Sequence, residues 1–382
     1  MSSVEEFRAE IRSWLKTHLS GSFAALKGRG GPGREHEAFT ERLAWERHLA
    51  AHGWTCVGWP KEYGGRGAGI EEQIAFHEEY ALADAPARVN HIGEQLLGPT
   101  LIDHGTEEQK ARFLPPIRAV EELWCQGYSE PGAGSDLAAV RTRASLEDGR
   151  WVVNGQKIWT SLAHESQWCF VLARTEPLAG PGARRHAGLS YLLVPLDQPG
   201  VDIRPIVQLT GTSEFNEVFF DGATADAAHV VGPPGDGWRI AMATLGYERG
   251  VSTLGQQVGF RRELDALVAL ARRNGAAADP DIRDRLVRAW AELEALRAGA
   301  LRGTDPSAAK LYWSHWHRGL GELAMEVCGP AATLAAGAPY ELDDWQRLFL
   351  FSRADTVYAG SSEIQRNIIA ERVLGLPKEP RP

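Results

Sequence analysis

The chain has 382 residues, of which 43% are hydrophobic and 24% are charged. This composition is ordinary for a globular protein, and the length is sufficient for two or three domains. The formal net charge of −9 argues against nucleic acid as a partner, because phosphate binding requires a basic surface. No apolar run in the sequence is long enough to span a bilayer.

The N-terminus carries Glu5, Glu6 and Glu10 and has no basic region followed by an apolar core. We therefore expect neither a secretory leader nor a transit peptide. The four cysteines lie far apart in the sequence, and no pair has the spacing of a metal site or a redox motif. These features predict a cytoplasmic protein with free thiols and no metal site.

The first third of the chain has helical periodicity. Apolar residues recur at every fourth position, at Phe7, Ile11, Leu15 and Leu19. Similar patterns predict helices over 37–52, 71–83 and 94–104. Thr106 and Gln109 form a capping box for a further helix, which Pro115 and Pro116 are expected to end.

From about residue 123 to residue 221 the apolar period changes to two, which predicts strands. Asp148-Gly149 and Asn154-Gly155 are strong hairpin signals on either side of Arg150–Val153. Other strand candidates are 167–175, 189–194, 201–206 and 217–220. This spacing suggests a compact antiparallel barrel or sandwich.

Helical patterns return in the last part of the chain, where a long helix should run from about Gly237 to about Arg273. Further apolar stripes predict helices near 282–296, 307–327 and 341–353. A final helix should begin with Ser362 as its N-cap and Gln365 at the third position, and should stop at Gly375.

The sequence therefore predicts a mostly helical α+β fold. We expect an N-terminal helical domain over residues 1–121, a central β domain over 122–230 and a C-terminal helical bundle over 231–382.

One loop carries the clearest indication of a ligand. It spans Gln126–Asp136 and stands between two predicted strands. Pro131 fixes φ there, while Gly132 and Gly134 have no Cβ, so backbone N–H groups can come close to a flat or anionic ligand. A surface turn explains the same residues, and a dinucleotide fingerprint fits poorly because no third glycine follows at the right offset. The loop alone does not name a ligand.

Two later stretches follow this loop in order. They are Gly155-Gln-Lys-Ile-Trp-Thr-Ser161 and a segment that starts Tyr358-Ala-Gly-Ser-Ser-Glu363 and runs to Pro377. With the loop and the upstream stretch His104–Lys110, the ordered set resembles the acyl-CoA dehydrogenase family of flavoenzymes over nearly the whole chain. The resemblance implies an N-terminal helical domain, a central small β-barrel domain and a C-terminal four-helix bundle. It also implies FAD as cofactor and α,β-dehydrogenation of an acyl-CoA thioester to the 2-enoyl-CoA.

The resemblance assigns the cofactor site to these motifs. In the family, the loop that matches 126–135 lies along the flavin ring, and Trp159 matches an aromatic residue beside that ring. From the residues alone, a core aromatic of a strand is the favoured account of Trp159, and Ser361 and Ser362 are simple capping residues. The cofactor-binding set that the resemblance implies is Gln126, Tyr128, Ser129, Gly134, Ser135, Trp159, Thr160, Ser161, Gly329, Ser361 and Glu363.

The expected catalytic base departs from the commonest family pattern. Many members carry a catalytic glutamate just before the glycine of the final motif, where this chain has Ala359. A subset, resembling the isovaleryl- and long-chain-specific enzymes, places the glutamate on the long helix in a Glu-Arg pair. Leu245-Gly-Tyr-Glu-Arg-Gly250 matches that place, so the resemblance implies Glu248 as the base. A surface glutamate beside Arg249 is the alternative from the residues alone.

The same resemblance implies donors at the thioester carbonyl, because the enolate-like transition state needs stabilisation. The substrate-binding residues that it implies are Ser135, Tyr247, Arg249, Ala359 and Gly360.

Two family segments are incomplete in this chain. Arg272–Pro280 lacks the Phe-Gly that contacts a neighbouring subunit's FAD, and Glu326–Pro330 retains only Gly329 of an adenine contact. Three functions therefore remain open: a dehydrogenase that uses Glu248, a flavin monooxygenase or oxidase of the same fold, and a subunit of a heteromeric dehydrogenase.

The resemblance further implies a role in lipid metabolism, with electron-transfer flavoprotein as the electron acceptor. It implies a homotetramer or a dimer, and it leaves a heterotetramer open. The acyl group cannot be deduced from the sequence.

Overall fold

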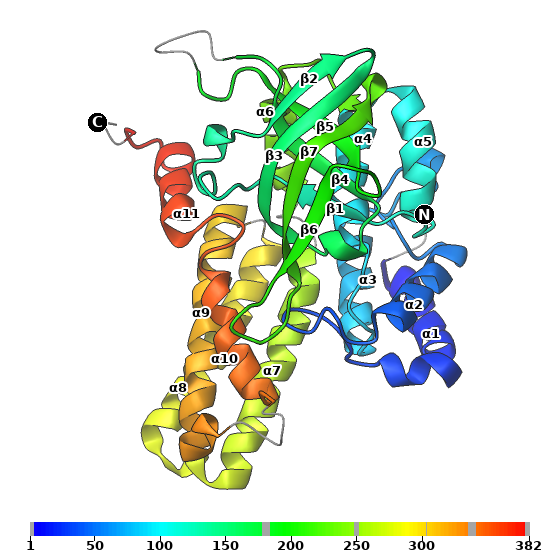
Figure 1. Ribbon diagram of the computed structural model, residues 1–382. Helices are drawn as coiled ribbons and strands as arrows, with labels where there is room; N and C mark the ends of the chain where they lie inside the picture. The colour runs from blue at the N-terminus through cyan, green and yellow to red at the C-terminus, as the bar shows by residue number, and fades with distance from the viewer. Residues whose placement is uncertain (1–3, 178–183, 248–251, 303, 335–340, 379–382) are drawn as a thin grey trace. The chain divides into compact units, whose positions relative to one another are not determined.

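The computed structural model describes residues 4–177, 184–247, 252–302, 304–334 and 341–378, which form two compact units (Figure 1). The first unit contains residues 4–75 and 83–247, and the second contains 76–82 and 252–378. Helices come first in the chain, strands follow, and helices return, as the periodicity predicts. Within the described ranges, no helix is both long and apolar enough to cross a membrane.

Five α-helices precede the sheet among the described residues, and apolar side chains on one face of a helix are buried in the core. They are α1 (Val4–His18), α2 (Phe39–Ala51), α3 (Ile70–Leu82), α4 (Gly98–His104) and α5 (Glu107–Arg118). α1 buries Phe7, Ile11 and Leu15, the residues at every fourth position. The capping box of α5 is present: the hydroxyl of Thr106 accepts from the N–H of Gln109, and the side chain of Gln109 accepts from the N–H of Thr106.

The prediction that Pro115 and Pro116 end this helix is wrong. Both prolines lie inside α5, which continues to Arg118. Proline removes a backbone donor and normally breaks a helix interior. Here Leu114 and Ile117 flank the prolines and are each 1% exposed, so burial of this face offsets the lost hydrogen bonds.

The central segment forms one eight-stranded sheet with the order β6-β7-β3-β2-β4-β5-β8, and β1 pairs with β4 (Figure 1). The strands are β1 (Trp124–Gly127), β2 (Arg143–Glu147), β3 (Arg150–Ser161), β4 (Trp168–Arg174), β5 (Leu189–Pro195), β6 (Val201–Ile206), β7 (Phe215–Asp226) and β8 (Val230–Val231). The sheet is mostly antiparallel, as expected. β1 and β2 nevertheless pair with β4 in parallel, which the long connections between these strands permit.

The middle of the sheet is covered on both faces. Along β4, Phe170 and Leu172 belong to a core shared with α4, α5 and α6 (Gly237–Tyr247), while Cys169 and Val171 face a second core formed with β3 and β7. Alternate side chains of a strand point to opposite faces, so a strand buried on both sides is apolar throughout. This double cover gives the loop after β1 a rigid base.

Only one of the two predicted hairpins exists. Asp148 and Gly149 both have positive φ, 47° and 77°, and they connect β2 to β3. Asn154-Gly155 does not turn, because β3 runs through it with a register shift beside Asn154. A Cβ at Gly155 would lie 2.4 Å from the hydroxyl of Thr142, so this glycine permits close backbone approach within a strand.

The second unit is helical. It contains α7 (Ser252–Asn274), α8 (Pro280–Leu301), α9 (Pro306–Cys328), α10 (Asp344–Asp355) and α11 (Ser362–Ile368), followed by a π-helical turn over Ile369–Val373. α7 to α10 share one apolar core, which includes Leu267, Leu293, Leu320 and Leu348. The end of α3 also belongs to this unit, because Glu78 pairs with Arg297 of α8 at 3.2 Å. The long helix expected from Gly237 to Arg273 is described as α6 and α7, and residues 248–251 lie outside the described ranges.

Candidate active site

The loop after β1 is folded as a tight turn around Pro131 and Gly132. The N–H of Glu130 donates to the carbonyl of Ala133 at 3.0 Å, and the N–H of Ala133 donates to the carbonyl of Glu130 at 2.9 Å. A Cβ placed on Gly132 or Gly134 would meet no described atom within 4 Å. The outer side of the loop is therefore open, as a ligand-facing backbone requires.

A buried lysine joins this loop to β3. The ammonium of Lys157 donates to the carbonyl of Tyr128 at 3.0 Å, to Oε1 of Glu130 at 2.8 Å and to the carbonyl of Leu172 at 2.8 Å. These three acceptors use all three of its donors, which makes its complete burial tolerable. Lys157 therefore joins the loop 126–136 directly to the stretch 155–161, the second motif in the sequence.

The carboxylate of Glu130 fixes the other end of the loop. It accepts from the backbone N–H groups of Arg141 at 2.6 Å and Thr142 at 2.9 Å. Burial would raise the pKa of Glu130, but the charge of Lys157 and these hydrogen bonds outweigh it and lower the pKa. The ionised form thus holds the loop between β1 and β2.

Trp159 is the most exposed tryptophan of this region and has an unusual backbone. Its φ is +60°, and the residue is 56% exposed. It lies where the register of β3 against β7 shifts between Lys157 and Thr160, so the bulge turns the indole outward. Its ring is near only the edge of Phe215, at 6.3 Å between centroids, among the ring contacts described. The alternative of a core aromatic does not fit this position.

The other predicted cofactor residues of the first unit divide into two sets. Gln126, Ser129 and Ser161 are half-buried, and Gly134 and Ser135 are exposed on the loop. The carbonyl of Ser129 accepts from the N–H of Ile158 at 2.9 Å, so the loop and the segment that carries Trp159 and Ser161 lie side by side.

Tyr128 and Thr160 are placed differently from the other predicted residues. The ring of Tyr128 is 4% exposed and packs edge-on against Phe170 in the core. Thr160 is fully buried, and its carbonyl accepts from the side chain of Asn216 at 3.0 Å. The side chains of these two residues therefore lie in the core and are not exposed toward a ligand outside it.

Tyr247, a predicted substrate residue, is the last residue of α6. Its hydroxyl donates to the carboxylate of Asp103 on α4. Burial, and then the hydrogen bond to Asp103, raise the pKa of Tyr247. This contact anchors the end of α6. The predicted base Glu248 and the predicted substrate residue Arg249 follow directly and lie outside the described residues.

The second unit contributes the turn before α11. Ala359 has a φ of +51° and Gly360 a φ of +87°. The amide of Gln365, which is fully buried, donates to the carbonyls of Ala359 at 2.9 Å and Gly360 at 3.4 Å. This side chain holds two consecutive residues in a conformation that an L-residue such as Ala359 rarely adopts.

Ser361, not Ser362, is the N-cap of α11. The hydroxyl of Ser361 accepts from the N–H of Ile364 at 3.4 Å. The hydroxyl of Ser362 instead bonds Nε2 of His315 at 3.0 Å, because it points toward α9. Glu363 is exposed in the first turn. The prediction placed the cap one residue late, since both serines suit the position by type.

A buried imidazolium lies behind this turn. Nδ1 of His317 donates to Asp355 at 2.5 Å, and Nε2 donates to Glu263 at 3.0 Å. The other oxygen of Asp355 accepts from the hydroxyl of Tyr358 at 2.7 Å. Burial lowers the pKa of His317, but the two carboxylates outweigh it and raise the pKa to about 10. This network ties α7, α9 and α10 to the residue before Ala359.

Gly329, the last predicted cofactor residue, caps α9. Its φ of +60° and ψ of −143° are accessible to glycine, and a Cβ there would meet no described atom within 4 Å. Of the predicted cofactor and substrate residues that the structure describes, those of the loop 126–136, the stretch 159–161 and Tyr247 therefore lie in the first unit, and Gly329 and 359–363 lie in the second.

Three family descriptions match consecutive parts of this chain. They are "Acyl-CoA dehydrogenase, N-terminal domain" over residues 2–121, "Acyl-CoA dehydrogenase, middle domain" over 125–223 and "Acyl-CoA dehydrogenase, C-terminal domain" over 235–374. Together they account for most of the sequence. The chain belongs to the acyl-CoA dehydrogenase family.

Individual acyl-CoA dehydrogenases are similar over the whole length. Acyl-CoA dehydrogenase IpdE1 of Mycobacterium tuberculosis is 66% identical, and the alignment covers 99% of each chain. The solved structure "Tcur3481-Tcur3483 steroid ACAD" aligns with a TM-score of 0.84 at 30% identity over 98% of both chains. The ChsE4-ChsE5 complex from Mycobacterium tuberculosis aligns with a TM-score of 0.81 at 29% identity over 99% of both chains.

These findings confirm the family, the fold and the acyl-CoA dehydrogenase activity that the sequence resemblance implied. Four residues hold the site in place in roles that were not predicted from the sequence, namely Glu130, Lys157, Gln365 and His317. Glu130, Lys157 and Gln365 stand inside the quoted motifs. A charged residue within a predicted strand was the only sequence signal for Lys157. Its partners lie in distant segments of the chain, so they can be identified only from the fold.

Proposed function

We propose that this acyl-CoA dehydrogenase binds FAD along the loop 126–136 and Trp159, and that Glu248 removes the α-proton of the acyl-CoA. The single observation that supports the FAD site best is the conformation of Trp159. A bulge in β3 holds this residue exposed at positive φ, beside the loop that Lys157 anchors. Exposing an indole and straining its backbone both cost free energy, which a flat ligand against the ring would offset.

The residues present fit a flavin. The open side of Gly132 and Gly134 leaves room for a ring against the backbone, and the hydroxyls of Ser129 and Ser161 are near the surface. When bound, FAD would accept the hydrogen that leaves the β-carbon. The protein's part is to hold the loop rigid, through Lys157 and Glu130, and to cover one side of the ligand with Trp159.

Glu248 is proposed as the base on sequence grounds. The common family position holds Ala359, and the Glu-Arg pair of the other placement is present as Glu248-Arg249. The residue before it, Tyr247, is anchored to Asp103, so the chain enters this segment from a defined point. We propose that Ser135, Tyr247, Arg249, Ala359 and Gly360 line the substrate, with a backbone N–H near Gly360 as a donor to the thioester oxygen.

We further propose that the acyl group carries a fused ring system and that a second, similar chain completes the assembly. The related structures named a steroid ACAD and the ChsE4-ChsE5 complex support these two points. The absence of Phe-Gly from 272–280 also supports a different partner at the FAD pyrophosphate. We propose a heterotetramer ahead of a homotetramer or dimer.

Three remaining assignments are proposals of the same kind. Electron-transfer flavoprotein would reoxidise the enzyme, as the family resemblance implies. Four free cysteines favour the cytoplasm. The domain division would be 1–121, 122–230 and 231–382.

The test is anaerobic reduction of the flavin by a panel of acyl-CoA thioesters, with straight, branched and ring-bearing acyl groups. The purified chain is first scored for flavin absorbance. It is then mixed with each thioester, alone and after co-purification with a candidate partner chain. Bleaching that requires Glu248 and is fastest with ring-bearing thioesters supports the proposal. A folded protein that does not take up FAD under any of these conditions contradicts it.

A further inference from the structure

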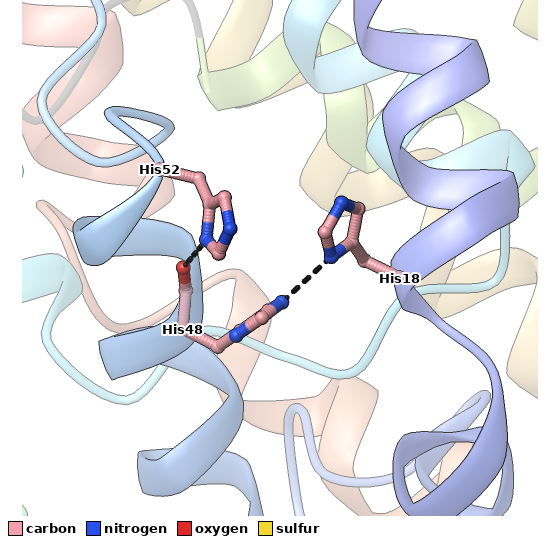
Figure 2. Close-up of side chains that lie close together, drawn as sticks. All are labelled: His18, His48 and His52. Carbon is pink, nitrogen blue, oxygen red and sulfur yellow. Dashed lines mark hydrogen bonds between the residues drawn. The ribbon is translucent and has the colours of Figure 1, made fainter.

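Three histidines meet at the ends of α1 and α2. His18 is the last residue of α1, His48 lies in the last turn of α2, and His52 directly follows α2 (Figure 2). One ring nitrogen from each side chain lies within 4.8 Å of those of the other two. No other group of three or more histidine, cysteine or acidic side chains with this geometry occurs among the described residues.

The hydrogen bonds of the three rings orient their lone pairs. Nδ1 of His52 lies 2.8 Å from the carbonyl of His48, which can only accept, so this nitrogen carries the proton and Nε2 of His52 has a free lone pair. Nδ1 of His18 and Nε2 of His48 lie 2.8 Å apart and share one proton (Figure 2). A backbone carbonyl that accepts from one ring nitrogen commonly fixes the orientation of a histidine that binds a metal ion through its other nitrogen.

The spacing in sequence also favours chelation. His48 and His52 are four residues apart, which places them on the same face at the end of α2. Two histidines at this spacing on a helix are a known pair of metal ligands. His18 supplies the third ring from α1, so the ligands come from two elements rather than one.

The surroundings favour neutral rings. The indole of Trp14 stacks on His18 at 4.3 Å between ring centroids and also lies 5.6 Å from His48. Burial, and next the neighbouring histidines, lower the pKa of His18 and His48. Neutral imidazoles suit Zn²⁺, Cu²⁺ and Ni²⁺ because the ligand nitrogen must be unprotonated. His52 is exposed, so an ion can reach the cluster from solvent.

We propose that His18, His48 and His52 bind a divalent first-row transition-metal ion such as Zn²⁺, with one position left for water. Around a tetrahedral Zn²⁺ the nitrogens would stand about 3.4 Å apart, so small rotations of the rings suffice. The proton now shared by His18 and His48 moves to the outer nitrogen of its ring through solvent, and each ring stays neutral. The bound ion would link the end of α1 to the end of α2. Its three ligands lie far in the sequence from the loop 126–136, where FAD is proposed to bind.

The experiment uses the full-length enzyme with its flavin, freed of any affinity tag and dialysed against a chelator. Zn²⁺ is titrated by calorimetry, and thermal unfolding is followed with and without Zn²⁺. We expect one ion per chain and a higher melting temperature with Zn²⁺, because a ligand of the native state stabilises it. With Cu²⁺ as the probe, electron paramagnetic resonance should show nitrogen ligands.

The matched variants are His52→Gln and His36→Gln. Both histidines are exposed, but only His52 belongs to the cluster. We expect His52→Gln to weaken Zn²⁺ binding by about tenfold or more while its flavin absorbance and its unfolding without metal stay as in the parent. His36→Gln should bind as the parent does. Equal binding by His52→Gln and the parent, equal loss in both variants, or no binding by the parent would each overturn the proposal.

Discussion

Trp159 carries the strongest single-residue indication of a ligand in this enzyme. The residue is 56% exposed at a φ of +60°, and a residue held in such a conformation costs about 1–3 kcal/mol. Packing within the chain does not account for that cost, because Phe215 alone provides a described ring contact. A planar ligand against the indole would account for it.

Trp159→Gly should therefore separate stability from cofactor binding. Glycine adopts positive φ without strain, so we expect the melting temperature of the apoprotein to stay equal or rise. Loss of the aromatic contact should weaken FAD binding by about tenfold, measured by titration of flavin fluorescence. Trp159→Phe is the control, since it keeps a ring. Equal FAD affinity in Trp159→Gly and the parent would remove Trp159 from the site.

Glu248→Gln should abolish dehydrogenation while FAD remains bound. The exchange preserves volume but removes the proton acceptor, and loss of a general base typically lowers a rate by about two to four orders of magnitude. The measurement is the rate of anaerobic flavin bleaching by the best thioester of the panel. Glu62→Gln, at an exposed position, should bleach at the parent rate. Parent-rate bleaching by Glu248→Gln would show that another group is the base.

Adding Ala359→Glu to Glu248→Gln should restore part of the activity. The common family pattern has its glutamate at this position, and Ala359 already carries a Cβ at positive φ, so the longer side chain adds no backbone strain of that kind. The bleaching rate of the double variant is compared with that of Glu248→Gln. A double variant that binds FAD but bleaches no faster would argue against Ala359 as a substrate-lining residue.

At the scale of secondary structure, one buried ion pair joins β3 to the loop that leaves β1. Lys157 and Glu130 have side-chain exposures of 0% and 7%. Such a pair gives little net stability compared with an apolar replacement, but removing one partner leaves a buried charge alone. The pair therefore specifies where the loop lies.

Lys157→Met should destabilise the protein by about 3–5 kcal/mol and lower its flavin content. Lys157→Met combined with Glu130→Gln should be less destabilised, because no buried charge is left unpaired. The control Lys110→Met removes a pair with Glu107, whose side chain is 79% exposed, and should cost less than about 1 kcal/mol. Denaturant unfolding of the flavin-free proteins measures all three. Equal losses in Lys157→Met and Lys110→Met would contradict the argument.

The helices of the second unit should show a pH dependence set by His317. Its pKa is about 10 in the folded chain and ordinarily about 6.5. A raised folded pKa gives stability that is complete below about pH 6.5 and is lost as the pH rises through about 10. Between these values the free energy of unfolding should fall by up to about 1.4 kcal/mol per pH unit.

The measurement is the melting temperature between pH 6.5 and pH 9.5 for the parent and for His317→Gln. We expect the variant to be less stable at pH 6.5 and to have a flatter profile, because Gln does not titrate. Parallel profiles for the two proteins would show that His317 is not the group responsible.

For the whole molecule, the predicted site residues are divided between two units. The loop and Trp159 belong to the first, and the turn of Ala359 and Gly360 belongs to the second.

We expect an assembly larger than a monomer, and we expect FAD to stabilise it, because a ligand of the native state stabilises that state. We expect light scattering after gel filtration to give a dimer or tetramer, and co-purification with the correct partner chain to raise the flavin content. The altered segment 272–280 is the reason to expect a partner that differs from this chain. A monomer that turns over acyl-CoA at full flavin content would contradict this expectation.

The local sequence was sufficient to predict those features that depend only on interactions between residues close together in the chain. The stripe of α1, the capping box at Thr106 and the turn at Asp148-Gly149 all rest on interactions within a few residues. The ordered motifs were sufficient for the family as well, because each is a run of adjacent residues.

Tertiary contacts decided those features that the sequence predicted wrongly or did not predict. Burial of Leu114 and Ile117 carries α5 through two prolines, and pairing with β7 carries β3 through Asn154-Gly155. Lys157 meets Glu130 across 27 residues, and His18 meets His48 across 30. Propensity and spacing report on local preference, whereas packing and charge pairing depend on which distant side chains the fold brings together.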